Sequence, residues 1–263
     1  MISEEILAKI KELRQIDRRI KTNCYIAFQT EPGKVWDTLE SEKSLIIKNY
    51  EGGKERILFY TCDFCDLKKL AEQCSSDSTI EILSKNKEDM AQEMENIGYY
   101  PLTHMCRVSC ADITEVIMSE NMTKEYDPGV GAYADISDAG DIRDILWDTF
   151  DTRVSHLPTS EELVEYIKNR EFYIIRDDFG QIVTLIQSKI SAKSYYCNQV
   201  INKGDKENFH KAVYNVLRKY VDEGGKYAFA WVEEENIASL KFFEKYNLKN
   251  DGLWNTVYIK NNS

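Results

Sequence analysis

The chain has 263 residues, of which 43% are hydrophobic and 11% aromatic, and 34 Lys and Arg against 45 Asp and Glu give a formal charge of −11. This apolar content excludes a disordered chain and suits one large domain or two ordinary ones. We find neither a run of roughly 20 apolar residues, as a membrane span needs, nor a signal peptide. We therefore expect a cytoplasmic protein without a membrane partner. The negative charge disfavours nucleic acid and favours a cationic partner.

Seven cysteines lie in the sequence, and an odd number without an export signal predicts free thiols rather than a disulfide scaffold. Cys62 and Cys65 form a CxxC motif between a predicted strand and a predicted helix, which is the layout of a redox site. A second alternative is a zinc site built from Cys62, Cys65, His104 and Cys106, although the second pair lacks a usual ligand spacing. We interpret most of these thiols as small buried apolar groups, in preference to a redox or zinc site.

In the first half of the sequence, segments with the apolar periodicity of a helix alternate with segments that have the periodicity of a strand. An apolar stripe at a spacing of 3.6 residues predicts a helix from Ile6 to about Thr22. Two β-rich runs flank Gly52-Gly53 and predict a hairpin, because glycine supplies the positive φ that the turn needs. The remaining elements are a helix, a strand, a helix closed by Gly98 and a strand, at residues 66–74, 79–83, 86–96 and 102–109.

The second half begins after an irregular stretch around residues 126–129, which is the best candidate for a domain boundary. Thr159 and Glu162 form a capping box at the start of a helix. In chain order we predict two helices, a hairpin of two strands, and then strand, helix, strand, helix, strand, at residues 140–150, 160–169, 171–176, 182–186, 194–201, 209–220, 227–232, 236–246 and 254–260. The repeated order predicts two related domains, residues 1–125 and 130–263.

One run near the end carries a family resemblance. The segment Asn236 to Leu248, directly after a buried strand, resembles the closing motif of the GNAT (Gcn5-related) N-acetyltransferases, which has Asn, then a small residue, then Phe-Tyr-Glu-Lys-x-Gly-Phe. The resemblance covers about residues 130–260. It implies an α/β (α+β) fold with two GNAT-like domains, each a central mixed, mostly antiparallel sheet flanked by helices. The domain of residues 1–125 looks like a degenerate copy.

The resemblance implies acetyl-CoA, or another acyl-CoA, as co-substrate, and no metal. A strand that runs into a helix N-terminus suits a pyrophosphate, because free N–H groups and the helix dipole favour an anion there. In this sequence the turn departs from the family pattern: Asp205 replaces a cation or amide, and Asn208 and His210 replace small residues. The cofactor-binding residues that the resemblance implies are Asn198, Val200, Lys203, Lys206, Asn208, Phe209, His210, Asn236, Ser239 and Phe243.

The catalytic residues also depart from the family pattern. Phe243 stands where many members of the family have a Tyr, whose phenol protonates the leaving thiolate of CoA. Tyr246 and Tyr258 are the candidate replacements, and the alternative for Tyr246 is that it packs the end of an amphipathic helix. Glu233 is the candidate general base, with a solvated charge as its alternative. Family substrate channels are lined by the first two helices and their connection, which here contains residues 148–156 with Asp148, Asp151, Arg153 and His156.

Together these features predict an N-acetyltransferase that moves an acetyl group directly from acetyl-CoA to an amine of a small molecule or peptide, and the acidic charge favours a cationic acceptor. The alternative is a catalytically degenerate GNAT-like module that binds acyl-CoA or another protein. A tandem arrangement also resembles transferases that take aminoacyl groups from tRNA, but the charge of −11 disfavours so large an anion. The oligomeric state is left open.

Overall fold

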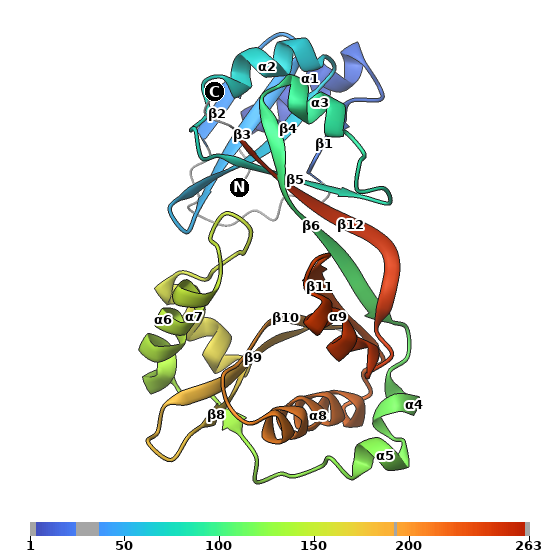
Figure 1. Ribbon diagram of the computed structural model, residues 1–263. Helices are drawn as coiled ribbons and strands as arrows, with labels where there is room; N and C mark the ends of the chain where they lie inside the picture. Colours follow the sequence, from blue (N-terminus) through green and yellow to red (C-terminus); the bar gives the residue numbers. More distant parts are fainter. Residues whose placement is uncertain (1–3, 25–36, 192–193, 261–263) are drawn as a thin grey trace. The chain divides into compact units, whose positions relative to one another are not determined.

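The computed structural model describes residues 4–24, 37–191 and 194–260, and it divides the chain into two compact units (Figure 1). Unit 1 contains Met1–Met105, Asp151–His156 and Leu253–Ser263, and unit 2 contains Cys106–Phe150 and Leu157–Gly252. The division falls within two long strands, β6 (Tyr99–Cys110) and β12 (Lys249–Lys260). The domain boundary predicted between residues 125 and 130 stays a prediction.

The other elements follow in chain order. Unit 1 contains α1 (Glu4–Ile16), β1 (Lys21–Thr22), β2 (Asp37–Glu40), β3 (Ser44–Glu51), β4 (Lys54–Thr61), α2 (Phe64–Ala71), β5 (Thr79–Ser84) and α3 (Ala91–Asn96). Unit 2 contains α4 (Thr114–Ile117), α5 (Glu120–Thr123), β7 (Ala132–Tyr133), the 3-10 turn η1 (Ile136–Asp138), α6 (Ala139–Thr149), α7 (Ser160–Lys168), β8 (Phe172–Arg176), β9 (Ile182–Ser191), β10 (Ser194–Asn202), α8 (Lys206–Asp222), β11 (Tyr227–Glu233) and α9 (Ile237–Glu244).

Unit 1 is a sheet with helices on both faces. Its strands lie in the order β2-β3-β4-β5-β12-β6, with β1 beside β4. Ile46, Ile57 and Phe59 pack against α2 and α3, while alternate residues Leu45 and Ile47 pack against α1. Successive strand residues point to opposite faces, and burying each large apolar side chain contributes about 1.5–3 kcal/mol. Both faces of the central strands are therefore apolar in sequence.

Local sequence signals explain most element ends in unit 1. The hairpin between β3 and β4 turns at Gly52 and Gly53, whose φ angles are 58° and 75°, as predicted. The helix predicted to reach Thr22 is shorter, because the Asp17 carboxylate accepts the Arg19 backbone N–H at 2.8 Å and forms a local turn instead. The helix predicted from residue 86 starts only at Ala91, since Met90 adopts a left-handed φ of 63°.

The last strand pairs inside unit 1. Residues 254–259 of β12 run antiparallel to β5, with Tyr258 opposite Ile80. The Tyr258 ring lies in the core shared by α2, α3, β4 and β5. The sheet of unit 1 is therefore completed by the C-terminal segment of the chain, a pairing that the sequence analysis does not specify.

Unit 2 has the strand order β6-β11-β10-β9-β8-β7. On one face, α6 and α7 pack against β8, β9 and β10 through Leu146, Leu163, Phe172, Leu185 and Ile201. On the other face lie α8 and α9. The predicted capping box at α7 is present, with the Thr159 and Glu162 side chains each accepting the other's backbone N–H. The order of two helices, a hairpin, and strand, helix, strand, helix, strand agrees with the predicted α/β layout.

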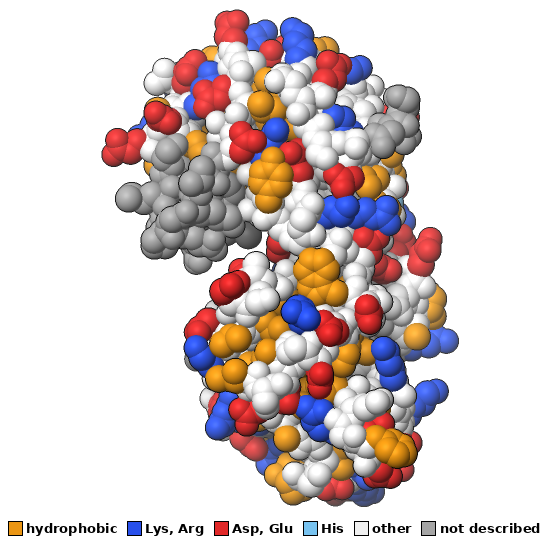
Figure 2. Space-filling model, turned by 90° about the vertical axis from the view of Figure 1, so that its left-hand side faces the viewer, with side chains coloured by type: hydrophobic (Ala, Val, Ile, Leu, Met, Phe, Trp, Pro, Cys, Tyr) orange, Lys and Arg blue, Asp and Glu red, His pale blue; other side chains and the backbone are white. Residues whose placement is uncertain are grey.

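The surface is mixed in charge. Figure 2 shows acidic, basic and apolar side chains interspersed over the face in view. Within the residues that the structure describes, none of the helices combines the length and apolar character that a membrane crossing requires.

Candidate functional site

Strands β10 and β11 of unit 2 separate halfway along their length. They run parallel and pair from Ser194 opposite Tyr227 to Cys197 opposite Ala230. Both strands continue beyond that point, but in the described structure no further residues of the two pair. At the same place a bulge between Cys197 and Gln199 shifts the register of β10 against β9. The outer part of β10 thus lacks a strand partner on one side, which leaves room for a ligand's backbone-like hydrogen bonds.

The face toward α8 and α9 is apolar at this opening. A cavity of about 20 Å³ lies among side chains of β9, β10, β11, α8 and α9, including the predicted residues Val200, Phe243 and Tyr246 together with Cys197 and Val213. Burial raises the pKa of the Tyr246 phenol well above its ordinary value. Tyr246 therefore keeps its proton at neutral pH. The sequence-based pairing of Phe243 with Tyr246 in one site is consistent with this lining.

The turn into α8 is capped by its own carboxylate. Asp205 is the N-cap residue, and its Oδ2 accepts the Asn208 backbone N–H at 2.8 Å. The side chain satisfies a helix amide that a bound phosphate would otherwise use. The exposed Lys203 anchors the turn through its backbone N–H, which donates to the Val183 carbonyl at 2.7 Å. The negative charge of Asp205 was evident from the sequence, whereas its capping role was not.

Three basic side chains converge between the start of α8 and the end of α9. The Lys245 Nζ lies 3.3 Å from the His210 Nε2. Burial lowers the pKa of His210, and the charges of Lys245 and Lys206 lower it further, while Glu125 opposes them. In the described chain Lys206 and Lys245 form no ion pair, whereas neighbouring Lys211 pairs with Glu207 at 2.8 Å. We call Lys206, His210 and Lys245 the basic cluster of unit 2; its positive charges are the two lysine ammonium groups, since the lowered pKa of His210 disfavours its charged form.

Aromatic rings border the basic cluster. Phe209 stacks on Phe242 with a centroid separation of 5.0 Å, and His210 lies 5.8 Å from the same ring. All three side chains are partly buried. The structure therefore places the predicted cofactor residues Phe209 and His210 together, packed against α9.

Other predicted residues have structural partners. Asn236 is the N-cap of α9, and its Oδ1 accepts the Ser239 backbone N–H at 3.0 Å. The Asn198 amide donates to the Gln187 Oε1 at 2.9 Å beside the bulge. Glu233 ends β11 and is exposed.

Of the predicted catalytic and cofactor-binding residues, Tyr258 is the one that lies outside unit 2. It belongs to unit 1, is 1% exposed, and burial raises the pKa of its phenol to about 12. We therefore leave Tyr258 out of the site proposed below.

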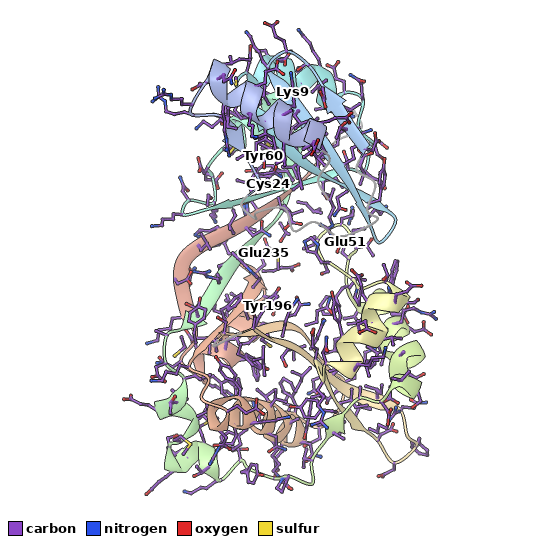
Figure 3. The ribbon with its side chains drawn as sticks, turned by 180° about the vertical axis from the view of Figure 1, so that it is seen from behind. Lys9, Cys24, Glu51, Tyr60, Tyr196 and Glu235 are labelled. Carbon is purple, nitrogen blue, oxygen red and sulfur yellow. The ribbon has the colours of Figure 1, made fainter. Side chains whose placement is uncertain are left out.

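Two predicted acceptor residues, Asp151 and Arg153, form an ion pair at 2.6 Å within unit 1. In the same segment His156 bridges two carboxylates: Nδ1 lies 2.7 Å from Glu51 Oε2, and Nε2 lies 2.9 Å from Glu81 Oε1. Arg56 pairs with both carboxylates, at 2.9 and 2.8 Å. We call Glu51, labelled in Figure 3, together with Arg56, Glu81 and His156 the charge clasp.

The redox and zinc alternatives receive no support from the geometry. Burial raises the pKa of the Cys62 thiol, which is opposite to the shift that a reactive thiolate needs, and its Sγ donates to the Leu13 carbonyl. The described residues include no group of three or more His, Cys, Asp or Glu side chains arranged for a metal.

Sequence reasoning missed several residues of the site. Lys245 completes the basic cluster, and Tyr196, Gln199 and Phe229 line the face of β10 and β11 opposite α8. Strict alternation along β11 is a signal that could have identified Phe229, but the bulge that redirects Gln199 has no clear sequence signature.

The protein is a mixed α/β protein in which the parallel strands β10 and β11 separate halfway along their length. No protein-family model and no curated protein matches the sequence. The solved structures that resemble the chain include the following three. A GCN5-related N-acetyltransferase from Sphaerobacter thermophilus is 11% identical over 83% of this chain and 76% of that one, with a TM-score of 0.55. A tandem GNAT protein from the clavulanic acid biosynthesis pathway is 8% identical over 84% and 80%, with a TM-score of 0.50.

The third is a GCN5-related glucosamine N-acetyltransferase region of a fungal multi-domain GH3 beta-N-acetylglucosaminidase, 9% identical over 82% of this chain and 31% of that one, with a TM-score of 0.56. At such identities the likeness concerns the fold. The chain has the GNAT fold, which confirms the predicted fold class. That the first half is a degenerate copy stays a prediction.

Proposed function

We propose that unit 2 is an acyl-CoA-dependent N-acyltransferase, with acetyl-CoA as the simplest donor and an amine as acceptor. The observation that carries this proposal is the separation of β10 and β11 after Cys197 and Ala230, combined with the bulge at Asn198. The unpaired edge of β10 suits the amide groups of a pantetheine arm, which can pair with a strand as a peptide does.

The donor approaches from the face that carries α8 and α9. Its thioester end lies at Cys197 and Val200, and opening the small cavity beside Phe243 and Tyr246 accommodates the acyl group. The donor's phosphates bind the basic cluster of Lys206, His210 and Lys245, because Asp205 occupies the helix amide and repels an anion at the usual place. The ammonium groups of Lys206 and Lys245 thereby gain a counter-charge that the described residues do not supply.

The reaction is a direct transfer. Glu233 takes the proton from the acceptor ammonium, the free amine nitrogen attacks the thioester carbon, a C–N bond forms and the C–S bond breaks. The departing thiolate takes its proton from the Tyr246 phenol, which replaces the hydroxyl that Phe243 lacks. The resulting phenolate takes back the second proton that the nitrogen loses as it becomes an amide, and Glu233 returns the first proton to solvent. The products are an amide and free CoA.

The test has a binding arm and a turnover arm. Lys245→Gln is expected to weaken CoA binding about tenfold. Lys249→Gln is the control, because it removes the same charge from an exposed lysine that is not among the charged groups that shift the pKa of His210; it should leave CoA binding unchanged. Tyr246→Phe is expected to lower amine-dependent thiol release from acetyl-CoA by about 10²-fold without weakening CoA binding. If acetyl-CoA neither raises the unfolding temperature nor releases thiol with any amine, the proposal is wrong.

The specific alternative is a binding module without turnover. The self-capped turn at Asp205 and the rings of Phe209 and Phe242 packed against each other favour it. This alternative predicts that CoA raises the unfolding temperature, that Lys245→Gln removes this effect, and that no amine releases thiol.

A further inference from the structure

The face of β10 and β11 opposite α8 carries a half-buried aromatic row. Tyr195, Cys197 and Ala228 line the α8 side, so the alternate residues Tyr196 and Phe229 point to the opposite face. Tyr196, labelled in Figure 3, and Phe229 stack with centroids 4.8 Å apart and ring planes within 5°. Tyr227 stacks on the same Phe229 ring at 5.6 Å.

This aromatic row borders the point where the strands separate. Tyr196 and Phe229 are register partners, and only one more pair follows before the pairing ends. Trp231 and Glu233 continue the same face of β11 beyond the last pair, by alternation. The row therefore reaches from the paired part of the sheet to the opening, and a carboxylate lies at its far end.

A buried amide adds a polar anchor at the same place. The bulge returns Val200 to the α8 side and so directs Gln199 to the face of Tyr196 and Phe229. Gln199 is 4% exposed, and among the described residues its Oε1 has no hydrogen-bond partner. A buried acceptor without a donor is costly, and a ligand N–H that reaches it removes that cost.

The donor and the acceptor bind on opposite faces of strands β10 and β11. If the donor lies on the α8 side, as proposed above, the acceptor nitrogen must reach the thioester carbon through the opening from the opposite face. There it meets the aromatic row, with the Arg107 guanidinium 5.9 Å from the Phe229 ring centroid, and also the Gln199 amide oxygen, which has no partner among the described residues, and the Glu233 carboxylate. Flat rings prefer flat partners, because stacking contributes about 0.5–1.5 kcal/mol beyond area burial.

Resting on the proposed function, we propose that the acceptor is a primary amine that carries a planar aromatic group a short chain away. Its ring lies against Phe229 and Tyr196, an amine N–H donates to Gln199 Oε1, and Glu233 receives the proton that the ammonium loses.

The experiment compares 2-phenylethylamine with 2-cyclohexylethylamine and putrescine in thiol release from acetyl-CoA. We expect kcat/KM for 2-phenylethylamine to exceed that for the saturated analogue at least tenfold. Phe229→Leu is expected to abolish this preference, and Phe179→Leu, at a hairpin tip where Phe179 is 90% exposed, to retain it. Gln199→Leu is expected to raise KM for 2-phenylethylamine about tenfold while the KM for acetyl-CoA is unchanged.

Equal kcat/KM for the aromatic and saturated amines overturns the inference and leaves the proposed function standing. An unchanged amine KM in Gln199→Leu also overturns it, since the orphan amide would then be only a structural defect. If no amine releases thiol, the proposed function fails, and equilibrium binding of the same amines decides the inference. Tighter binding of 2-phenylethylamine that Phe229→Leu removes supports it, and equal binding of both amines overturns it.

Discussion

The charge clasp of unit 1 gives the most quantitative prediction. Both imidazole nitrogens of His156 face carboxylates, and although burial opposes the charged form, hydrogen bonds to Glu51 and Glu81 raise the pKa of His156 from 6.5 to about 9. A rise of this size corresponds to a ceiling of about 3.4 kcal/mol at 1.36 kcal/mol per pKa unit. Because the His156 side chain is 55% exposed, solvent screening reduces the expected contribution to about 1 kcal/mol.

The sign follows from linkage. The folded pKa lies above the unfolded value, so the stabilisation is fully present below pH 6.5 and is lost as the pH rises through about 9. We expect His156→Gln to lower the free energy of unfolding by about 1 kcal/mol at pH 6, and the difference from wild type to vanish near pH 10. Thermal and urea unfolding from pH 5.5 to 10 measure this difference in the free energy of unfolding. The control is Arg143→Gln, which removes an exposed ion pair between Arg143 and Asp144. A difference that stays constant over this range would refute the reasoning.

Three further predictions concern separate parts of the chain. Asp205→Asn keeps an N-cap but removes a negative charge beside the basic cluster, so CoA is expected to bind several-fold more tightly in calorimetry, whereas unchanged affinity would contradict the charge argument. Removing residues 253–263 leaves β5 without its antiparallel partner and the unit 1 core without Tyr258; circular dichroism and NMR should show unit 1 unfolded, and a folded unit 1 would contradict the pairing. Gly131→Ala places a Cβ 2.4 Å from the Tyr173 ring at a φ of 79°, so we expect a loss of at least about 1 kcal/mol, and an unchanged unfolding temperature would contradict the packing.

Elements with strong local signals were predictable. The Gly52-Gly53 hairpin, the capping box at Thr159 and the apolar stripes of α7 and α8 each depend on neighbours within a few residues. The short helices α4 and α5 were missed, because four residues are too few to show a helical period.

Long-range features were not predictable from local pattern. The alternation in β12 is the same whether it pairs with β5 or with another strand, so the sequence does not specify that Tyr258 completes unit 1. Likewise, Lys245 and His210 are 35 residues apart, and only the packing of α9 against α8 brings them within 3.3 Å. The family motif indicated the segment that forms α9, while the partners of its side chains depended on tertiary contacts.

Hydrogen exchange with and without CoA tests the central claim, that the donor binds at the separated strands of unit 2. We predict slower exchange at the backbone amides of residues 198–202 and 206–210 when CoA is added to the intact protein, with unit 1 unchanged. Unchanged exchange in both segments at saturating CoA, or protection confined to unit 1, would contradict it.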